Sequence, residues 1–273
     1  MEYIAFNQTM IKKEELSIPF DDRGYYFGDG IYEVIRLYNG KPFALDDHLT
    51  RLIESAEKLD LPIQQRDSIK QTILTLIEKN KPIDGSIYIQ ITRGSEPRNH
   101  LYSRETKPTV LGFIQPLPSK TKSEASVWLE PDIRWLRCDI KSINLLGNVL
   151  AKRKAADHGC DEAILHRDTV LTEGSSSNVF LVKDQVLYTH PATNLILNGI
   201  TRQIIIRLAK EHGLDVIEEP FPYEVLEHAD EAFLTSTMVE VMPITEIEGE
   251  MNVTLPIGSI TKKLQMLFKE QVH

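Results

Sequence analysis

The order of strand-like and helix-like segments constrains the fold of this chain more than any other feature. Apolar stretches rich in Val, Ile, Phe and Tyr predict strands at residues 33–38, 86–92, 109–115, 161–167, 178–190 and 231–237. A helical spacing of apolar residues predicts helices at residues 46–59, 67–80, 144–159, 199–213 and 259–270. The two kinds of segment are mixed without the regular βαβ rhythm of a Rossmann sheet or a (β/α)₈ barrel. We therefore expect a mixed α/β fold of another type.

A chain of 273 residues exceeds the usual size of one hydrophobic core, so two domains are expected. The stretch "PLPSKTKSE" at residues 116–124 crowds proline and lysine between two regions of strands and helices, which is typical of a linker. We place the linker at residues 118–122. This predicts a small N-terminal α/β domain, residues 1–117, a larger C-terminal α/β domain, residues 123–273, and a cleft between them.

Charge and composition exclude several classes of protein. The chain has 31 Lys and Arg against 40 Asp and Glu and no basic stripe, which argues against a nucleic-acid partner. The start, "MEYIAFNQTM", has no basic segment before an apolar one, and no apolar run could span a bilayer, so we expect a cytoplasmic protein without membrane contact. Cys138 and Cys160 form no metal pattern and the eight histidines show no paired spacing, so no metal is expected.

Lys141 stands among apolar and small neighbours in "CDIKSINLLGN", residues 138–148. Removing an ammonium group from water is costly, so a lysine at such a position needs a partner or a chemical role. A desolvated lysine with a lowered pKa is a neutral amine that can attack carbonyls or move protons. The alternative is a lysine at a strand end whose ammonium group reaches the surface.

Two segments downstream are candidates for ligand binding. "TEGSSSN", residues 172–178, sets Glu173 before three hydroxyls and an amide; it is either a polar turn or a site for the ring nitrogen of a heteroaromatic ligand. In "NGITR", residues 198–202, a glycine opens a periodic helix. The backbone N–H groups and the Thr201 hydroxyl at that helix start suit a phosphate.

Two segments of the first half are candidates for substrate binding. "TRGSEPRNH", residues 92–100, carries Arg98 and His100 on a polar loop between two predicted strands. This loop is either simply solvated or suited to an anionic carboxylate, because guanidinium binds carboxylate through two parallel hydrogen bonds. "YYFGDGIYE", residues 25–33, lacks the third glycine of a dinucleotide loop, so we interpret it as a tight turn before a strand that presents Tyr32.

These motifs in this order resemble those of the fold-type-IV pyridoxal-phosphate (PLP) enzymes, the branched-chain aminotransferase-like superfamily. The most specific pattern combines "EGSSSNVF" at residues 173–180, "LYTHP" at 187–191 and "LNGITR" at 197–202. "DRGYYFGDGIYEV", "IRWLRCDIKSINLLGNVLAK" and "TSTMVE" match as well, and the chain is most similar to the bacterial D-amino-acid aminotransferases of this superfamily. The resemblance implies a two-domain fold with the active site in the interdomain cleft and PLP as the cofactor.

The resemblance also implies the residues of the cofactor site. Lys141 matches the lysine that binds PLP as a Schiff base and, once displaced by substrate, moves the proton. Glu173 matches the carboxylate that faces the pyridine nitrogen and keeps it protonated. Leu197 matches the apolar residue packed against the ring face. The contacts to the phosphate and to the hydroxyl side of the ring match Arg51, Ser176, Ile200, Thr201, Ser236 and Thr237.

The substrate site is implied in the same way. Tyr32, Arg98 and His100 match the residues that hold the substrate carboxylate in the D-amino-acid enzymes. Arg98 and His100 come from the neighbouring subunit in that family, so the resemblance implies a homodimer. The segment "LYSRETK", residues 101–107, departs from the family's pattern and leaves the side-chain preference open.

The implied activity is PLP-dependent transamination between D-amino acids and 2-oxo acids, with D-alanine and 2-oxoglutarate giving pyruvate and D-glutamate. Two alternatives on the same scaffold are an L-branched-chain aminotransferase and an aminodeoxychorismate lyase. A third is a module that binds PLP without catalysis. The presence of Lys141, Glu173 and Arg51 together argues against the third.

Overall fold

The computed structural model describes residues 2–117 and 122–272, which divide into two compact units. The first unit contains Met1–Ser119 and Ile140–Leu145, and the second contains Lys120–Asp139 and Leu146–His273. The predicted linker at residues 118–122 lies outside the described residues except for Lys122. The segment Ile140–Leu145 follows that linker in the sequence but packs with the first unit.

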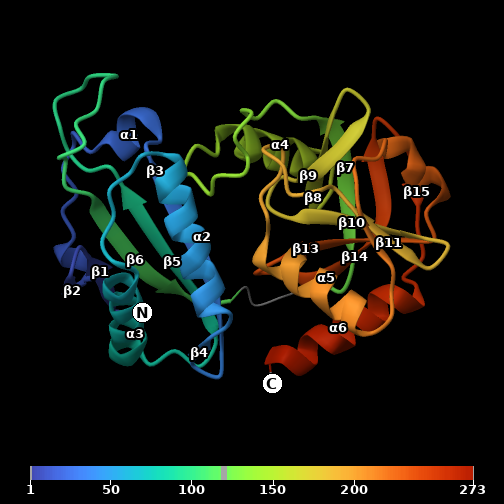
Figure 1. Ribbon diagram of the computed structural model, residues 1–273, viewed down its shortest axis with the longest axis horizontal. Helices are drawn as coiled ribbons and strands as arrows, with labels where there is room; N and C mark the ends of the chain where they lie inside the picture. Colours follow the sequence, from blue (N-terminus) through green and yellow to red (C-terminus); the bar gives the residue numbers. More distant parts are fainter. Residues whose placement is uncertain (1, 118–121, 273) are drawn as a thin grey trace. The chain divides into compact units, whose positions relative to one another are not determined.

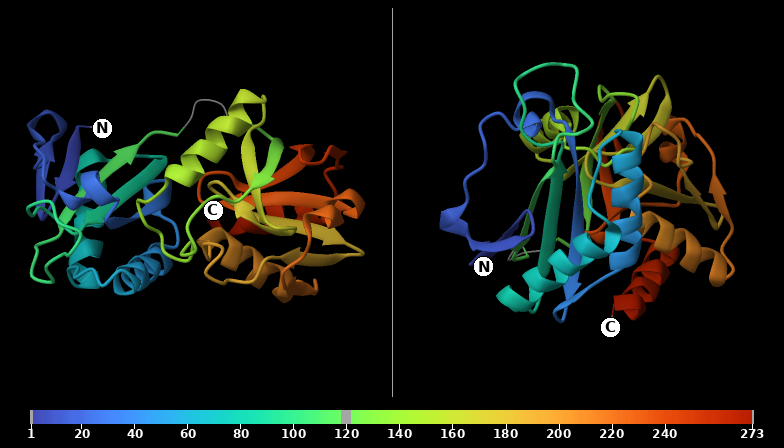
Figure 2. Two further views of the ribbon diagram at one scale, coloured as in Figure 1. Left: turned by 90° about the horizontal axis from the view of Figure 1, so that it is seen from above. Right: turned by 60° about the vertical axis from the view of Figure 1, so that its left-hand side comes forward.

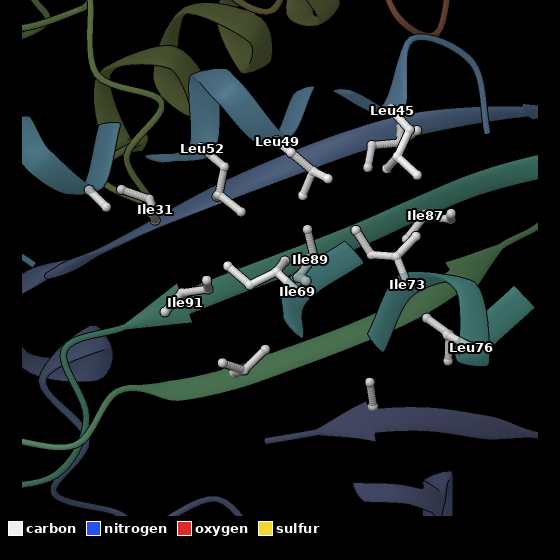
Figure 3. Close-up of a cluster of buried hydrophobic side chains, with 14 of the residues drawn as sticks. Ile31, Leu45, Leu49, Leu52, Ile69, Ile73, Leu76, Ile87, Ile89 and Ile91 are labelled. Carbon is white, nitrogen blue, oxygen red and sulfur yellow. The ribbon is translucent and has the colours of Figure 1, made fainter. Parts of the chain in front are cut away.

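The first unit is an antiparallel sheet with two helices on one face (Figure 1). Within the described residues its strand order is β2-β1-β6-β5-β3-β4. Helices α2 and α3 place apolar residues three or four positions apart toward the sheet, as amphipathic helices do (Figure 3). The elements are β1 (Tyr3–Phe6), β2 (Thr9–Lys12), η1 (Lys13–Glu15), α1 (Arg23–Phe27), β3 (Gly30–Tyr38), β4 (Lys41–Pro42), α2 (Leu45–Lys58), α3 (Arg66–Asn80), β5 (Gly85–Thr92) and β6 (Thr109–Gln115).

The core of the first unit sorts the residues of β3 onto two faces. Side chains alternate along a strand, and Ile31, Ile35 and Leu37 are fully buried in the cluster with α2 and α3. The alternate residues, which begin with Tyr32, are only half-buried. The segment Ile140–Leu145 joins this unit beside β3, where Ser142 pairs with Ile31 and Ile140 enters the core.

The second unit is a mixed sheet with strand order β12-β11-β10-β13-β14-β7-β8-β9 in the described residues, and β15 pairs with β14. Helices α5 and α6 lie side by side (Figure 2). The elements are β7 (Ala125–Pro131), α4 (Leu146–Asp157), β8 (Glu162–Arg167), β9 (Val170–Gly174), β10 (Asn178–Lys183), β11 (Val186–Thr189), α5 (Ile200–Glu211), β12 (Val216–Glu218), η2 (Tyr223–His228), β13 (Glu231–Ser236), β14 (Glu240–Gly249), β15 (Val253–Thr254) and α6 (Ser259–Val272).

Two local expectations need correction. The strand predicted at residues 178–190 is a hairpin, because Asp184 and Gln185 adopt positive φ angles of 52° and 64° and reverse the chain between β10 and β11. The helix predicted at residues 46–59 is α2, which begins one residue earlier, at Leu45; the Asp46 carboxylate in its first turn accepts hydrogen bonds from side chains of α3.

Two negative findings apply to residues 2–117 and 122–272. In this part of the chain, no helix combines the length and the apolar character that a bilayer crossing requires. The same residues contain no group of three or more His, Cys, Asp or Glu side chains arranged to hold a metal ion.

Candidate active site

Lys141 is held by backbone hydrogen bonds on both sides of its residue. Its N–H donates to the Ser55 hydroxyl of α2 at 3.2 Å, and its carbonyl accepts from the Tyr32 N–H of β3 at 3.0 Å. The side chain is half-buried, and its Nζ lies 4.3 Å from the centroid of the Tyr32 ring. Lys141 was expected to need a partner or a chemical role. The face of the Tyr32 ring is such a partner, since an aromatic ring attracts a cationic amine through its quadrupole.

Tyr32 begins a row of aromatic rings on the half-buried face of the first sheet. Its ring stacks on Tyr88 with centroids 5.6 Å apart, and Tyr88 stacks on Phe113 at 5.0 Å. The Tyr88 hydroxyl donates to Gln90 Oε1 at 2.8 Å, and burial raises the pKa of Tyr88 to about 12. The stacking of Tyr32 on Tyr88, and of Tyr88 on Phe113, thus holds the Tyr32 ring in its position beside Lys141.

Arg51 of α2 is buried and paired with Glu33 of β3. Its Nε donates to Oε1 at 2.7 Å and its Nη2 to Oε2 at 2.9 Å, and His48 Nδ1 also lies 2.7 Å from Oε2. Burial alone would raise the pKa of Glu33, but the charges and hydrogen bonds of Arg51 and His48 hold it well below the usual range. This two-point pairing fixes the plane of the Arg51 guanidinium.

Arg98 and His100 lie on the loop between β5 and β6, and both are exposed. The Arg98 guanidinium carbon lies 5.3 Å from the centroid of the Phe27 ring, and the His100 ring meets the same ring edge-on at 5.5 Å. The structure therefore brings these two predicted substrate residues together on one aromatic side chain.

Glu173 lies near the end of β9, where three hydrogen bonds hold its carboxylate. It is buried, and its Oε1 accepts from Arg134 Nη1 at 2.6 Å. Its Oε2 accepts from Asn178 Nδ2 and from the Leu197 N–H, both at 3.0 Å. Burial raises the pKa of Glu173 to about 7, against the opposing charge of Arg134. The carboxyl group is thus poised between its charged and neutral forms near neutral pH.

Asn178 joins Glu173 to the start of α5. Its Nδ2 also donates to the Leu197 carbonyl at 2.8 Å, and a Cβ added to Gly199 would overlap its Oδ1. Gly199 is the N-cap of α5 and has no side chain to occupy the N–H groups of the first turn. Glu173, Leu197 and the helix start at Ile200 and Thr201 therefore form one cluster.

The serines after Glu173 form a tight turn whose hydroxyls bind Glu162. The Gly174 N–H donates to the Ser177 carbonyl at 2.7 Å, which closes the turn. Ser176 Oγ donates to Glu162 Oε2 at 2.6 Å, and Ser175 Oγ donates to Glu162 Oε1. Because the Ser176 proton points to Glu162, the lone pairs of its oxygen remain for another donor.

Ser236 and Thr237 lie at the end of β13, the strand that pairs with β10 through Asn178 and Thr235. Ser236 Oγ accepts from the Met238 and Val239 N–H groups at 3.3 and 3.2 Å, which shapes the turn into β14. The register places both residues at the same end of the sheet as Asn178.

Sequence reasoning missed the partners that fix the predicted residues. Glu33 holds Arg51, Arg134 holds Glu173, and Glu162 holds Ser176. A signal for Glu33 was present, because it occupies an inward position of a strand whose other inward residues are apolar. No comparable local signal marks Arg134 or Glu162.

Comparison with known proteins shows which family this chain resembles over most of its length. The family model of class IV amino-transferases matches residues 30–247. D-alanine aminotransferase of Staphylococcus epidermidis is 43% identical over 279 residues, which cover 100% of this chain and 99% of that protein. Two solved structures are also similar. Branched-chain aminotransferase from Thermoproteus uzoniensis with norvaline has a TM-score of 0.91 at 28% identity, covering 99% of this chain and 94% of that one. Branched-chain amino acid aminotransferase from Escherichia coli has a TM-score of 0.89 at 28% identity, covering 98% and 93%.

These matches confirm the resemblance drawn from the motifs and the mixed α/β fold. The family model covers well over half of the chain, and the curated relative aligns with it from end to end. The chain therefore belongs to the class IV aminotransferases.

Proposed function

We propose that this protein is a PLP-dependent D-amino-acid transaminase that moves the amino group of D-alanine to 2-oxoglutarate, giving pyruvate and D-glutamate. The observation that carries the proposal is the pair of exposed hydrogen-bond donors, the Arg98 guanidinium and the His100 ring, that both contact Phe27. Such a pair suits a carboxylate, which every amino-acid and 2-oxo-acid substrate of this reaction has. The identity of 43% to a D-alanine aminotransferase supports D-alanine as the amino donor.

Class IV aminotransferases use PLP, and side chains of the second unit fit this group. The buried Glu173 carboxylate suits a pyridine nitrogen that carries a proton. The start of α5 suits a phosphate, because its N-cap residue, Gly199, has no side chain that could bind the N–H groups of the first turn. We propose that the phosphate and ring are held by Glu173, Ser176, Leu197, Ile200, Thr201, Ser236 and Thr237, with Arg51 adding positive charge.

When bound, PLP supplies an aldehyde carbon that bonds to amines and a ring that takes up electron density. We propose that Lys141 Nζ is the protein's amine, and that it removes the proton from the substrate α-carbon and would deliver it to the aldehyde-derived carbon that PLP supplies. Its place 4.3 Å from the Tyr32 ring supports this role. If Tyr32 helps to hold the substrate carboxylate, the α-carbon, which is bonded to that carboxylate, comes close to Lys141.

A homodimer is part of the proposal. Arg98 and His100 are exposed, so they are available to a second copy of the chain. Large apolar side chains are exposed on both units, including Phe20 (82%) and Leu101 (80%) on the first and Leu146 (68%) on the second. We propose that the loop of one protomer completes the substrate site of its partner.

Mixed dimers test this exchange of loops. Arg98→Ala and Lys141→Ala chains are each expected to be nearly inactive at low substrate concentration. In a two-fold dimer that contains one of each, one site keeps both functional residues. Co-expression should therefore restore about a quarter of wild-type activity. Activity no higher than that of the separate variants would mean that the loop serves its own chain.

A half-reaction assay tests the reaction itself. The purified PLP enzyme is mixed with D-alanine, L-leucine or aminodeoxychorismate, and the absorbance of the bound cofactor and the released product are followed. Conversion by D-alanine, with pyruvate as product, supports the proposal. Conversion by L-leucine alone would indicate a branched-chain aminotransferase, and pyruvate release from aminodeoxychorismate alone would indicate the lyase. No conversion by any of them would indicate a binding module.

The proposed compartment is the cytosol. Cys138 and Cys160 are both buried free thiols in the described chain, which is typical of proteins that stay in a reducing environment.

A further inference from the structure

The loop that carries Arg98 and His100 extends beyond the ends of β5 and β6 and lies beside α1 (Figure 1). A long exposed side chain on such a loop samples many conformations, and ordering it for a ligand costs conformational entropy. A binding site on this loop therefore gains affinity if other residues hold it in place before the ligand arrives.

The side chain of Arg23 in α1 binds the loop through several hydrogen bonds. Its side chain is buried, and its Nε donates to Asp29 Oδ2 at 2.8 Å. Its Nη1 donates to Glu96 Oε1 at 2.8 Å and to the Asn99 carbonyl at 2.6 Å, and its Nη2 donates to the His100 carbonyl at 3.4 Å. Asn99 lies between the two predicted substrate residues, so this guanidinium fixes the backbone where they stand.

Phe27, one turn along α1 from Arg23, contacts the side chains themselves. The Arg98 guanidinium carbon lies 5.3 Å from its ring centroid, the His100 ring lies at 5.5 Å, and the Arg23 guanidinium carbon lies at 4.6 Å. A single aromatic ring therefore keeps both groups near each other while leaving their outer faces exposed.

The base of the loop is anchored separately. Arg93 Nε donates to Asp29 Oδ2 at 2.9 Å, the acceptor that Arg23 also uses. Its other nitrogens donate to the Asp60 and Leu59 carbonyls at 2.7 and 2.8 Å, at the end of α2. The loop base thus stays attached without Arg23, so a loss of Arg23 releases the part of the loop near Arg98 rather than the whole loop.

We propose that Arg23 and Phe27 are positioning residues for the substrate carboxylate. They hold Arg98 and His100 in one arrangement before substrate binds, so that the substrate carboxylate meets two groups that are already ordered. The inference rests on the proposed function, in which Arg98 and His100 bind that carboxylate. To that function the inference adds two residues, Arg23 and Phe27, that affect how tightly both the amino acid and the 2-oxo acid bind.

Steady-state kinetics of the PLP enzyme test the inference with Arg23→Gln and Phe27→Leu. Arg23→Gln should raise KM for D-alanine and for 2-oxoglutarate by about tenfold, and Phe27→Leu by about threefold, while kcat changes by less than about twofold. Cofactor absorbance should not change. Hydrogen exchange at residues 96–100 should accelerate in Arg23→Gln, whereas exchange in β5 and β6 should not.

Arg104→Gln is the matched control. Arg104 lies on the same loop and pairs with a carboxylate, Asp60, at 2.7 Å, but its side chain is 78% exposed, whereas that of Arg23 is buried. This variant should keep the wild-type KM and kcat. Should Arg23→Gln fail to fold, Glu96→Gln removes a partner of the same guanidinium from the loop side and should also raise KM. Where Arg23→Gln does fold, the variant that combines it with Glu96→Gln should raise KM by less than the sum of the two single effects, because both changes break the same contact.

The outcomes separate this inference from the proposed function. If Arg98→Ala raises KM but Arg23→Gln, Glu96→Gln and Phe27→Leu do not, the positioning role is wrong and the substrate site stands. If the Arg23→Gln and Glu96→Gln variants lower kcat as much as they raise KM, or lose cofactor, their role is general stability and the inference is overturned. If Arg98→Ala leaves KM unchanged as well, the proposed carboxylate site fails.

Discussion

Replacing Glu173 with glutamine in the PLP-free protein should remove a pH dependence of the free energy of unfolding. Burial raises the pKa of Glu173 from 4.5 to about 7. Between these two values the folded protein keeps a proton that the unfolded chain has released, so stability falls as pH rises. Stability from this group is complete below pH 4.5 and is lost as pH passes about 7. At about 1.36 kcal/mol for each pKa unit, the loss is about 3 kcal/mol.

Urea unfolding of the wild type and of Glu173→Gln from pH 4.5 to about 8 measures this loss. Glutamine is neutral, but its amide nitrogen is a donor and must face either Arg134 or the Leu197 N–H, which are donors too. That mismatch has a cost that does not vary with pH. The informative quantity is therefore the change with pH of the difference between the two proteins.

We expect the wild type to lose about 3 kcal/mol relative to Glu173→Gln over this range. If the wild type instead gains stability relative to the variant, the charge of Arg134 outweighs burial and Glu173 is ionised throughout. The reasoning that burial dominates this carboxyl group would then be refuted. The expected result would mean that Glu173 already holds a proton in part of the PLP-free molecules at neutral pH.

Three further predictions concern the residues around the candidate site. Gly199→Ala sets a methyl group against Asn178 and should weaken PLP binding and lower stability by about 1–3 kcal/mol, measured by cofactor titration and urea unfolding; unchanged binding would contradict the close approach. Glu33→Gln removes the charge of the buried carboxylate that accepts two hydrogen bonds from Arg51 and should cost about 3–5 kcal/mol in urea unfolding, and a loss below about 1 kcal/mol would show that this ion pair contributes little to stability. Arg98→Ala should raise KM for both amino and oxo acids by about 10- to 100-fold in steady-state assays, because the lost contact holds a carboxylate in every bound state, and an unchanged KM would refute that role.

Much of the candidate site could be predicted from sequence because its residues lie in short, dense motifs. Glu173, Leu197 and Thr201 are brought together over a span of fewer than thirty residues by one hairpin and one helix start. Lys141 was conspicuous because its neighbours are apolar. Such residues can be recognised from the sequence alone, since each signal depends only on the immediate neighbours of the residue in the chain.

The partners that hold these residues could not be predicted in this way. Arg134 and Glu173 are 39 positions apart, and Arg51 and Glu33 are 18 apart on a helix and a strand. Nothing in a local pattern specifies which buried acid meets which buried base, because tertiary packing decides it. Only the inward position of Glu33 on β3 offered a clue.

The fold shows the same division between local and distant signals. The long amphipathic helices were predicted closely, and the break between β10 and β11 was missed because Asp184 and Gln185 turn the chain without glycine or proline. The short edge strand β12 and the minor strand β15 have too few residues for a pattern to emerge.

Every other proposed role depends on Lys141 being the residue whose Nζ forms a covalent bond with PLP. Borohydride reduces such a bond to a stable amine, so treatment of the PLP enzyme followed by peptide mapping identifies the lysine involved. We predict a pyridoxyl adduct on the peptide that contains Lys141 and none in Lys141→Ala. An adduct on another lysine, or no adduct in the wild type, would contradict the proposed site.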